Sequence, residues 1–215
     1  MPQDAIHNYA LMYALWNKAR FAAGYKAHYL TDLQKMDYYA TPAHPVGKPD
    51  LKDWIGSRPT HFDRVKITYN SISELAAIRM GKVQTNIPAQ SSYYKFPPLT
   101  CYEFYLISKE EPKNLIRIGK KFIPARLQVQ KLKKCLLRNG RHSPCHLVNM
   151  ADLPSGAKIQ ECTIMFGFPT PLMAHVVVES EFIEACDNCG QRITVQTPNR
   201  EIYKSLPDLN ILVQK

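Results

Sequence analysis

Residues 114–132, NLIRIGKKFIPARLQVQKL, contain two short strand-like runs on either side of a glycine-lysine-lysine turn. In the second run, apolar and polar residues alternate: Ala125, Leu127 and Val129 with Arg126, Gln128 and Gln130. A period of two is typical of a strand with one buried face. The segment therefore predicts a hairpin that packs one face on a core and exposes the other.

The exposed face of this hairpin is predicted to be basic. Its surroundings include six cationic residues and no acidic one: Arg117, Lys120, Lys121, Lys131, Lys133 and Lys134. Such a surface is a candidate binding site for a polyanion. From this segment alone, a solvated basic hairpin that binds no ligand is an equal alternative. The whole chain has 28 Lys and Arg against 18 Asp and Glu, a net charge of +10. This balance favours a nucleic acid or an anionic membrane as partner.

The sequence argues against the membrane. No apolar run approaches the roughly 20 residues that a spanning helix needs. The first residues, MPQDAIHN, also lack a charged region followed by an apolar one. Without an export signal, we expect the protein in the cytoplasm, with its six cysteines reduced.

The remaining patterns predict mixed helix and strand. Residues 4–18 predict a helix capped by Asp4, with an apolar stripe formed by Ile6, Tyr9, Ala10, Tyr13 and Ala14. A capping box predicts a second helix at 71–81. Strands are expected at 64–70, 101–108 (a central strand), 162–168, 172–183 and 192–196, and loops at 38–59, 84–98 and 138–156. This order predicts an α+β fold on an antiparallel sheet, not a doubly wound nucleotide-binding fold.

Aromatic residues lie in or beside the predicted loops that also hold Lys or Arg: Tyr38, Tyr39, Tyr69, Tyr93, Tyr94 and Phe96. Single-stranded RNA is commonly held by stacking on aromatic side chains together with phosphate contacts. Buried tyrosines would give the same pattern, so it supports RNA binding without establishing it.

Catalytic motifs are missing from the sequence. No phosphate-binding glycine motif, GxSxG, HExxH or paired carboxylate cluster is present. Metal-independent RNA cleavage needs only acid–base groups, and His7, His61, His142 and His146 are candidates for it. Each is more simply read as a loop or cap residue.

A metal site is the remaining chemical signal. Cys186 and Cys189 form a CxxCG turn that can place two thiolates on zinc, and His142 with Cys145 could complete four ligands. The alternative is that Asp187–Gly190 is an ordinary hairpin turn, and we prefer it. A zinc-stabilised DNA-binding protein is therefore a minor alternative.

The opening helix IHNYALMYALW (6–16) resembles the "HNYAL-YAL" helix of the Csc-type Cas-five subunit of type I-D CRISPR effector complexes. Later segments fit that family in order: KITYNS (66–71), KFPPLTCYEFYLI (95–107), IRIGKK (116–121), HLVNMADLP (146–154) and FGFPTPL (166–172). Family members usually carry a first strand before this helix, whereas only five residues precede it here.

The resemblance implies a single RAMP domain over residues 1–215, with a ferredoxin-like core and a protruding thumb, for which the insertion at about 38–60 is the candidate. It implies a non-catalytic subunit of an antiviral ribonucleoprotein complex, with metal-independent endoribonuclease as the runner-up and no cofactor. The implied partners are the guide RNA 5′ handle, a Cas-seven-type backbone subunit, a large Cas-ten-type subunit and target DNA near the PAM. The candidate RNA-binding residues are Lys66, Tyr69, Asn70, Arg79, Lys82, Tyr94, Lys95, Arg117, Lys120, Lys121 and Arg126.

Overall fold

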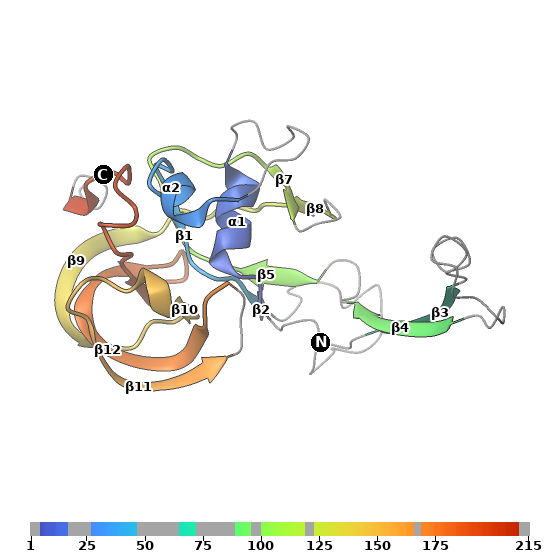
Figure 1. Ribbon diagram of the computed structural model, residues 1–215. Helices are drawn as coiled ribbons and strands as arrows, with labels where there is room; N and C mark the ends of the chain where they lie inside the picture. The colour runs from blue at the N-terminus through green and yellow to red at the C-terminus, as the bar shows by residue number, and fades with distance from the viewer. Residues whose placement is uncertain are drawn as a thin grey trace. The chain divides into compact units, whose positions relative to one another are not determined.

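The computed structural model describes residues 5–16, 27–46, 65–71, 89–95, 100–118, 123–165 and 169–210, with backbone alone for 65–71 and 89–95. The chain divides into two compact units (Figure 1). The smaller comprises Met1–Asp4 and Pro45–Tyr102, and the larger comprises Ala5–His44 and Glu103–Lys215. No helix among the described residues is long and apolar enough to cross a bilayer.

The described part of the smaller unit is mainly a two-stranded ribbon. Strands β3 (Val65–Ser71) and β4 (Ala89–Lys95) pair antiparallel along their whole length, from Val65 opposite Lys95 to Ser71 opposite Ala89. The alternation that predicted β3 is therefore confirmed. The prediction of a loop at 84–98 is wrong for residues 89–95, because pairing with β3 orders a segment that has little strand propensity of its own.

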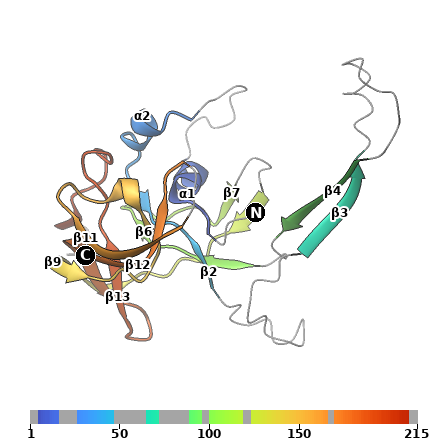
Figure 2. The same cartoon turned by 60° about the horizontal axis from the view of Figure 1, so that its bottom comes forward.

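The larger unit is built around β12 (Leu172–Cys186), a strand of 15 residues. Strands β10 (Val148–Asn149) and β9 (Lys133–His142) pair along one edge of β12. Strands β11 (Lys158–Met165) and β13 (Arg192–Gln196) pair along the other edge. All four pairings are antiparallel, and Figures 1 and 2 show that the long strands curve. The predicted antiparallel sheet is confirmed.

Smaller elements account for the remaining described helices and strands. Helices α1 (Asn8–Leu15) and α2 (Tyr29–Leu33) and the 3-10 turn η1 (Met150–Asp152) accompany three two-stranded sheets. These sheets are β1 (Tyr39–Ala40) with β6 (Leu106–Ile107), β2 (His44–Val46) with β5 (Cys101–Glu103), and β7 (Leu115–Ile118) with β8 (Ile123–Arg126). The β2–β5 pair lies where the chain passes between the units.

Helix α1 is attached to the rest of its unit by buried polar side chains. Asn8 Nδ2 donates to Asp152 Oδ2 at 2.5 Å, and the Tyr9 hydroxyl donates to Asp152 Oδ1 at 3.0 Å. Asn149 Nδ2 donates to Asn8 Oδ1 at 3.0 Å, and the backbone N–H of Asn199 donates to the Asp152 carbonyl at 2.7 Å. Asp152 therefore joins α1, the β10–η1 turn and the C-terminal segment.

Several predicted boundaries are corrected by the structure. Helix α1 starts at Asn8, because His7 Nδ1 accepts the N–H of Tyr9 as the cap and Ile6 is held in a bridge to Ala43. Asp4, the predicted cap, lies outside the described residues, as does 72–81 of the predicted second helix. Of the predicted stripe, Ala10 is exposed, whereas Asn8, Leu11 and Met12 are buried.

The other corrections concern strands. The predicted central strand at 101–108 is two short strands in separate sheets, interrupted where the Tyr105 carbonyl accepts the N–H of Thr41. The predicted loop at 38–59 contains β1 and β2, and 47–60 lies outside the described residues. The region 138–156 was predicted as mostly loop, and this is wrong for 138–142, because pairing with β12 extends β9 to His142. Residues 127–130, predicted as strand, lie beyond the end of β8.

Asp152 should make the stability of the fold pH-dependent. Burial raises the pKa of its carboxyl from 3.8 to about 6, with the hydrogen bonds from Asn8 and Tyr9 opposing the rise. The folded state then holds this proton more tightly than the unfolded state. Its contribution to stability is complete below about pH 4 and is lost as pH rises through about 6. The loss should be about 3 kcal/mol, because one pKa unit corresponds to about 1.4 kcal/mol.

We predict that the free energy of unfolding of the wild type, minus that of Asp152→Asn, falls by about 2 kcal/mol between pH 4 and pH 7, which covers most of the pH-dependent loss. The amide carries no proton to lose, so its own stability lacks this term. Urea denaturation at several pH values measures the difference, and Asp37→Asn, at an exposed position, is the control. A wild-type minus Asp152→Asn difference that is the same at pH 4 and pH 7 would refute the prediction.

Candidate nucleic-acid interface

The β7–β8 hairpin carries both of its arginines on one face. Leu115 pairs with Arg126 and Arg117 pairs with Pro124, so these four residues share one face, and all four are exposed. The other face carries Ile116, Ile118, Ala125 and Ile123. Ile116 is buried, and Ile118 and Ala125 are half-buried. The predicted hairpin and its two-faced character are confirmed.

Packing against α1 positions the hairpin. Strand β7 lies beside this helix, as Figure 1 shows, and Ile116 is 5% exposed. The N–H of Leu127 donates to the Asn114 carbonyl at 2.8 Å and closes the base of the hairpin. Arg117 and Arg126 are therefore presented to solvent by a fixed support.

The sequence around the hairpin carries the net charge of the protein. Residues 112–151 contain ten of the 28 Lys and Arg residues and none of the 18 Asp and Glu residues. The rest of the chain then has equal numbers of each sign. Such a segment attracts polyanions, of which a phosphate backbone is one.

The structure places the other predicted RNA-binding residues only in part. Lys120, Lys121, Arg79 and Lys82 lie outside the described residues. In the β3–β4 ribbon, Lys66 is directly opposite Tyr94. The other three predicted positions of the ribbon are Tyr69, Asn70 and Lys95, opposite Ser91, Gln90 and Val65. The predicted residues thus fall into two groups, one in each compact unit.

The sequence analysis did not predict that four cationic residues lie on strand β9. Lys133 and Lys134 were assigned to the surroundings of the hairpin, and Arg138 and Arg141 to a loop. All four are exposed on a ten-residue strand of the central sheet. The run of apolar residues from Cys135 to Leu137 was the available signal for a strand, and the Asn139–Gly140 pair masked it.

Three of the four candidate histidines serve as hydrogen-bonding groups inside the fold. His7 caps α1 and its Nε2 lies 3.1 Å from the Thr170 carbonyl, and burial lowers its pKa. His142 Nε2 lies 2.9 Å from Gln196 Oε1, and His146 Nε2 accepts the N–H of Gln196 at 3.1 Å. Burial lowers the pKa of His146 to about 4, so it is neutral at pH 7. His61 lies outside the described residues.

The candidate zinc ligands are not gathered at one point. His142 is opposite Val178 and Cys186 is opposite Lys133, eight residues further along β12, or about 26 Å at 3.3 Å per residue. Asp187 Oδ1 accepts the N–H groups of Cys189 and Gln191, and Gly190 has a φ of +83°. This is the predicted hairpin turn. The described residues contain no group of three His, Cys, Asp or Glu that could hold a metal.

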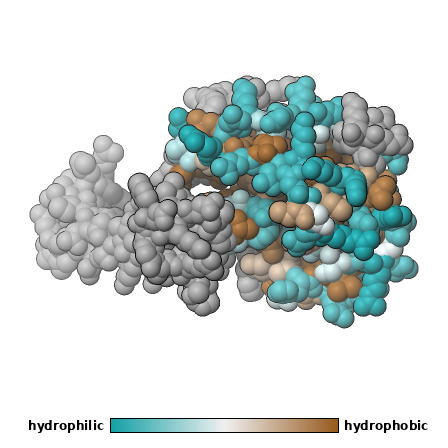
Figure 3. Space-filling view, turned by 180° about the vertical axis from the view of Figure 1, so that it is seen from behind, coloured by the Kyte–Doolittle hydropathy of each residue, from teal (hydrophilic) through white to brown (hydrophobic). Residues whose placement is uncertain are grey.

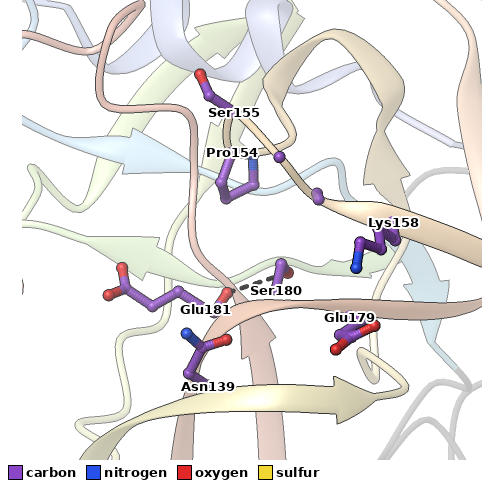
Figure 4. A pocket seen from close by; sticks show the side chains of 9 residues that line it. Asn139, Pro154, Ser155, Lys158, Glu179, Ser180 and Glu181 are labelled. Atoms are coloured by element: carbon purple, nitrogen blue, oxygen red, sulfur yellow. Dashed lines mark hydrogen bonds between the residues drawn. The ribbon is translucent and has the colours of Figure 1, made fainter.

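A pocket lies over the middle of β12 (Figure 4). The labelled side chains come from β9, β11, β12 and the turn before β11, and the lining includes Glu179, Glu181 and Lys158. None of the predicted RNA-binding residues lines it. Two carboxylates against one amine make it a poor phosphate site.

The chain was compared with known proteins. A family model described as type I-D CRISPR-associated protein Cas5/Csc1 matches residues 2–204, which include the hairpin, the central sheet and α1. No curated protein matches the chain.

The basic hairpin should contribute more to polyanion binding than equal charge elsewhere. We predict that replacing Arg117, Lys120, Lys121 and Arg126 together with Ala weakens binding of single-stranded RNA. Each lost phosphate contact should also reduce the slope of log affinity against log salt by roughly 0.7. The matched control replaces four exposed lysines from separate elements, Lys35, Lys109, Lys158 and Lys204. Fluorescence anisotropy between 50 and about 300 mM salt gives both quantities. Equal effects of the two variants would show that the hairpin is only a solvated face.

Proposed function

Because the chain belongs to the type I-D CRISPR-associated Cas5/Csc1 family, we propose that it is a guide-RNA-binding subunit of a type I-D CRISPR effector complex. In this proposal it binds the 5′ handle of the guide RNA in the cytoplasm. The observation that carries the proposal is the exposed basic face of the β7–β8 hairpin. Its arginines lie within the segment that holds the net positive charge of the chain.

Each compact unit holds one of the two groups of predicted residues, and we propose that each group contacts RNA. The hairpin supplies cations for phosphates, and the β3–β4 ribbon supplies Lys66 and Tyr94 at directly opposed positions. A cation next to an aromatic residue suits an unpaired nucleotide, which offers one phosphate and one base for stacking. A paired duplex has its bases stacked on each other and would leave the tyrosines without a partner.

We further propose that the subunit caps one end of a filament of Cas-seven-type backbone subunits. Its neighbours there would be the large Cas-ten-type subunit and target DNA near the PAM. A RAMP architecture with a ferredoxin-like core fits the α1 helix and antiparallel sheet of the larger unit. The region around residues 38–60 is the proposed thumb. Family membership is the support for these assignments.

The proposed role is non-catalytic. Acid–base cleavage of RNA needs a group that reaches the 2′-hydroxyl and the scissile phosphate. His7, His142 and His146 are buried and hydrogen-bonded to Thr170, Gln196 and neighbouring backbone. These contacts favour a structural role for the three histidines over a catalytic one.

The first test is retention of RNA in the assembled complex. Purified with its partner subunits, the protein should carry a guide RNA whose 5′ end resists exonuclease digestion. The Arg117, Lys120, Lys121 and Arg126 alanine variant should lose that protection, because it lacks the phosphate contacts. A complex that assembles fully without RNA, or an affinity that does not depend on salt, would contradict the proposal.

The second test addresses the endoribonuclease alternative. We expect the isolated protein to leave labelled repeat RNA intact in EDTA. The reason is that His7, His142 and His146 are buried and hydrogen-bonded within the fold. The readout is denaturing gel electrophoresis of the RNA after incubation. Specific cleavage that disappears in His61→Ala would favour the nuclease. His7 is tested with His7→Asn, because asparagine also caps helix N-termini and should disturb α1 less than alanine would.

A further inference from the structure

The side of β12 that faces the core changes along the strand. In its first part Val176, Val178 and Ser180 are buried, and in its last part Ile183 and Ala185 are buried. Side chains alternate between faces in a strand, so these two sets belong to opposite faces. The curvature of the long strands in Figure 1 accompanies this change. As a result, Phe182, Glu184 and Cys186 face outward, and each is half-buried.

Strand register brings cations to the same outward face. Phe182 is directly opposite Arg138 of β9, and Cys186 is opposite both Lys133 of β9 and Arg192 of β13. Directly opposed residues share a face. Lys133 and Arg138 are five residues apart and would point to opposite faces of a regular strand. The register shift at Lys134, whose φ is +51°, places them on one face. We call this surface, formed by Lys133, Leu136, Arg138, Phe182, Glu184 and Arg192, the Phe182 face.

The positive charge of the Phe182 face is only partly neutralised. Glu184, the acidic residue of this face, accepts from Arg192 at 2.6 Å. Lys133 and Arg138 are exposed on the strand across from it. Glu179 and Glu181 alternate onto the other face of β12, where Arg141 lies directly opposite Glu179. Lys133 and Arg138 are therefore separated from the other glutamates of β12.

Phe182 has the properties of a stacking platform. His142 packs against its ring with a centroid distance of 4.1 Å and an interplanar angle of 20°. His142 is itself held by the Gly140 carbonyl and by Gln196 Oε1, at 3.1 and 2.9 Å. His142 therefore contacts one side of the Phe182 ring and fixes its orientation. Phe182 as a whole is only half-buried. In Figure 3 hydrophilic residues are interspersed with smaller hydrophobic areas on the visible described surface.

We propose that the Phe182 face is a second nucleic-acid contact, separate from the β7–β8 hairpin. One unpaired base stacks on Phe182, and the adjoining phosphates contact Arg138 and Lys133. An oriented aromatic ring beside exposed cations is the combination with which sheet surfaces bind single strands. The inference goes beyond the guide-handle proposal, because it requires neither the hairpin nor the partner subunits.

Charge on the two faces of β9 provides a matched test. Arg138→Gln should weaken binding of a 12-nucleotide oligoadenylate to the full chain and reduce the salt slope by roughly 0.7. Arg141→Gln, three residues away on the other face and opposite Glu179, should change affinity by less than about twofold. Both residues are exposed, so both variants should fold, as thermal melting would verify. Equal effects of the two substitutions would overturn the proposal.

The aromatic ring is tested separately. Phe182→Leu keeps an apolar side chain but removes stacking, and it should weaken oligoadenylate binding by about 5- to 150-fold. Phe182→Tyr should remain close to wild type. Oligonucleotides carrying 5-iodouridine should crosslink on irradiation to a peptide that contains Phe182. Wild-type binding by a folded Phe182→Leu variant, or crosslinking only to the hairpin, would overturn the inference.

The outcomes also separate this inference from the proposed function. If Arg138→Gln and Phe182→Leu leave RNA binding intact while the hairpin variant abolishes it, the Phe182 face fails and the guide-RNA proposal stands. If both variants instead release a partner subunit without changing RNA affinity, the face is a protein interface and the inference is wrong. Oligoadenylate binding that depends on Phe182 in a chain that protects no guide handle would uphold the inference alone.

Discussion

The buried residue Asp152 joins parts of the chain that lie far apart in the sequence. It accepts from Asn8 and Tyr9 of α1, and its backbone carbonyl accepts from Asn199 near the C-terminus. A carboxyl that is only 2% exposed is costly to bury unless donors surround it. Its surroundings supply them, and Asn149 adds a further link through Asn8. Loss of this group would leave several buried donors without an acceptor, which is more costly than loss of one exposed hydrogen bond.

The position of α1 in turn decides where the basic hairpin stands. Strand β7 packs beside α1 through its buried face, and its opposite face carries Arg117 with Arg126 diagonally across the pair. A hairpin of four-residue strands would not be stable alone in water. The candidate interface therefore depends on a helix whose own position depends on Asp152. A buried polar network far in sequence from the hairpin thus contributes to its presentation.

In the central sheet, β12 is longer than any of the strands that pair with it, so no single partner strand covers a whole edge of β12. Between Glu179, which is opposite Lys158 of β11, and Phe182, which is opposite Gln196 of β13, one edge of β12 has no strand neighbour among the described residues. Gln196 Nε2 and Thr197 Oγ1 fill the gap by donating to the Glu181 carbonyl at 3.1 and 2.7 Å. Gln196 also contacts both His142 and His146. The same residues that close the sheet therefore orient the ring that stacks on Phe182.

Local patterns in the sequence determined much of this protein. Alternation identified β3, the β7–β8 hairpin and β13, and turn residues identified Asp187–Gly190, because these signals depend only on near neighbours. The mixture of helices with antiparallel sheets and the basic β7–β8 hairpin were also predicted from the sequence. Only the tertiary structure decided that residues 138–142 are strand and that 101–108 is divided. Pairing with β12 across about 40 residues overrode the Asn139–Gly140 turn signal. The same long-range register placed Arg138 beside Phe182. No local pattern contains that information, because the face that a strand buries is set by what packs on it.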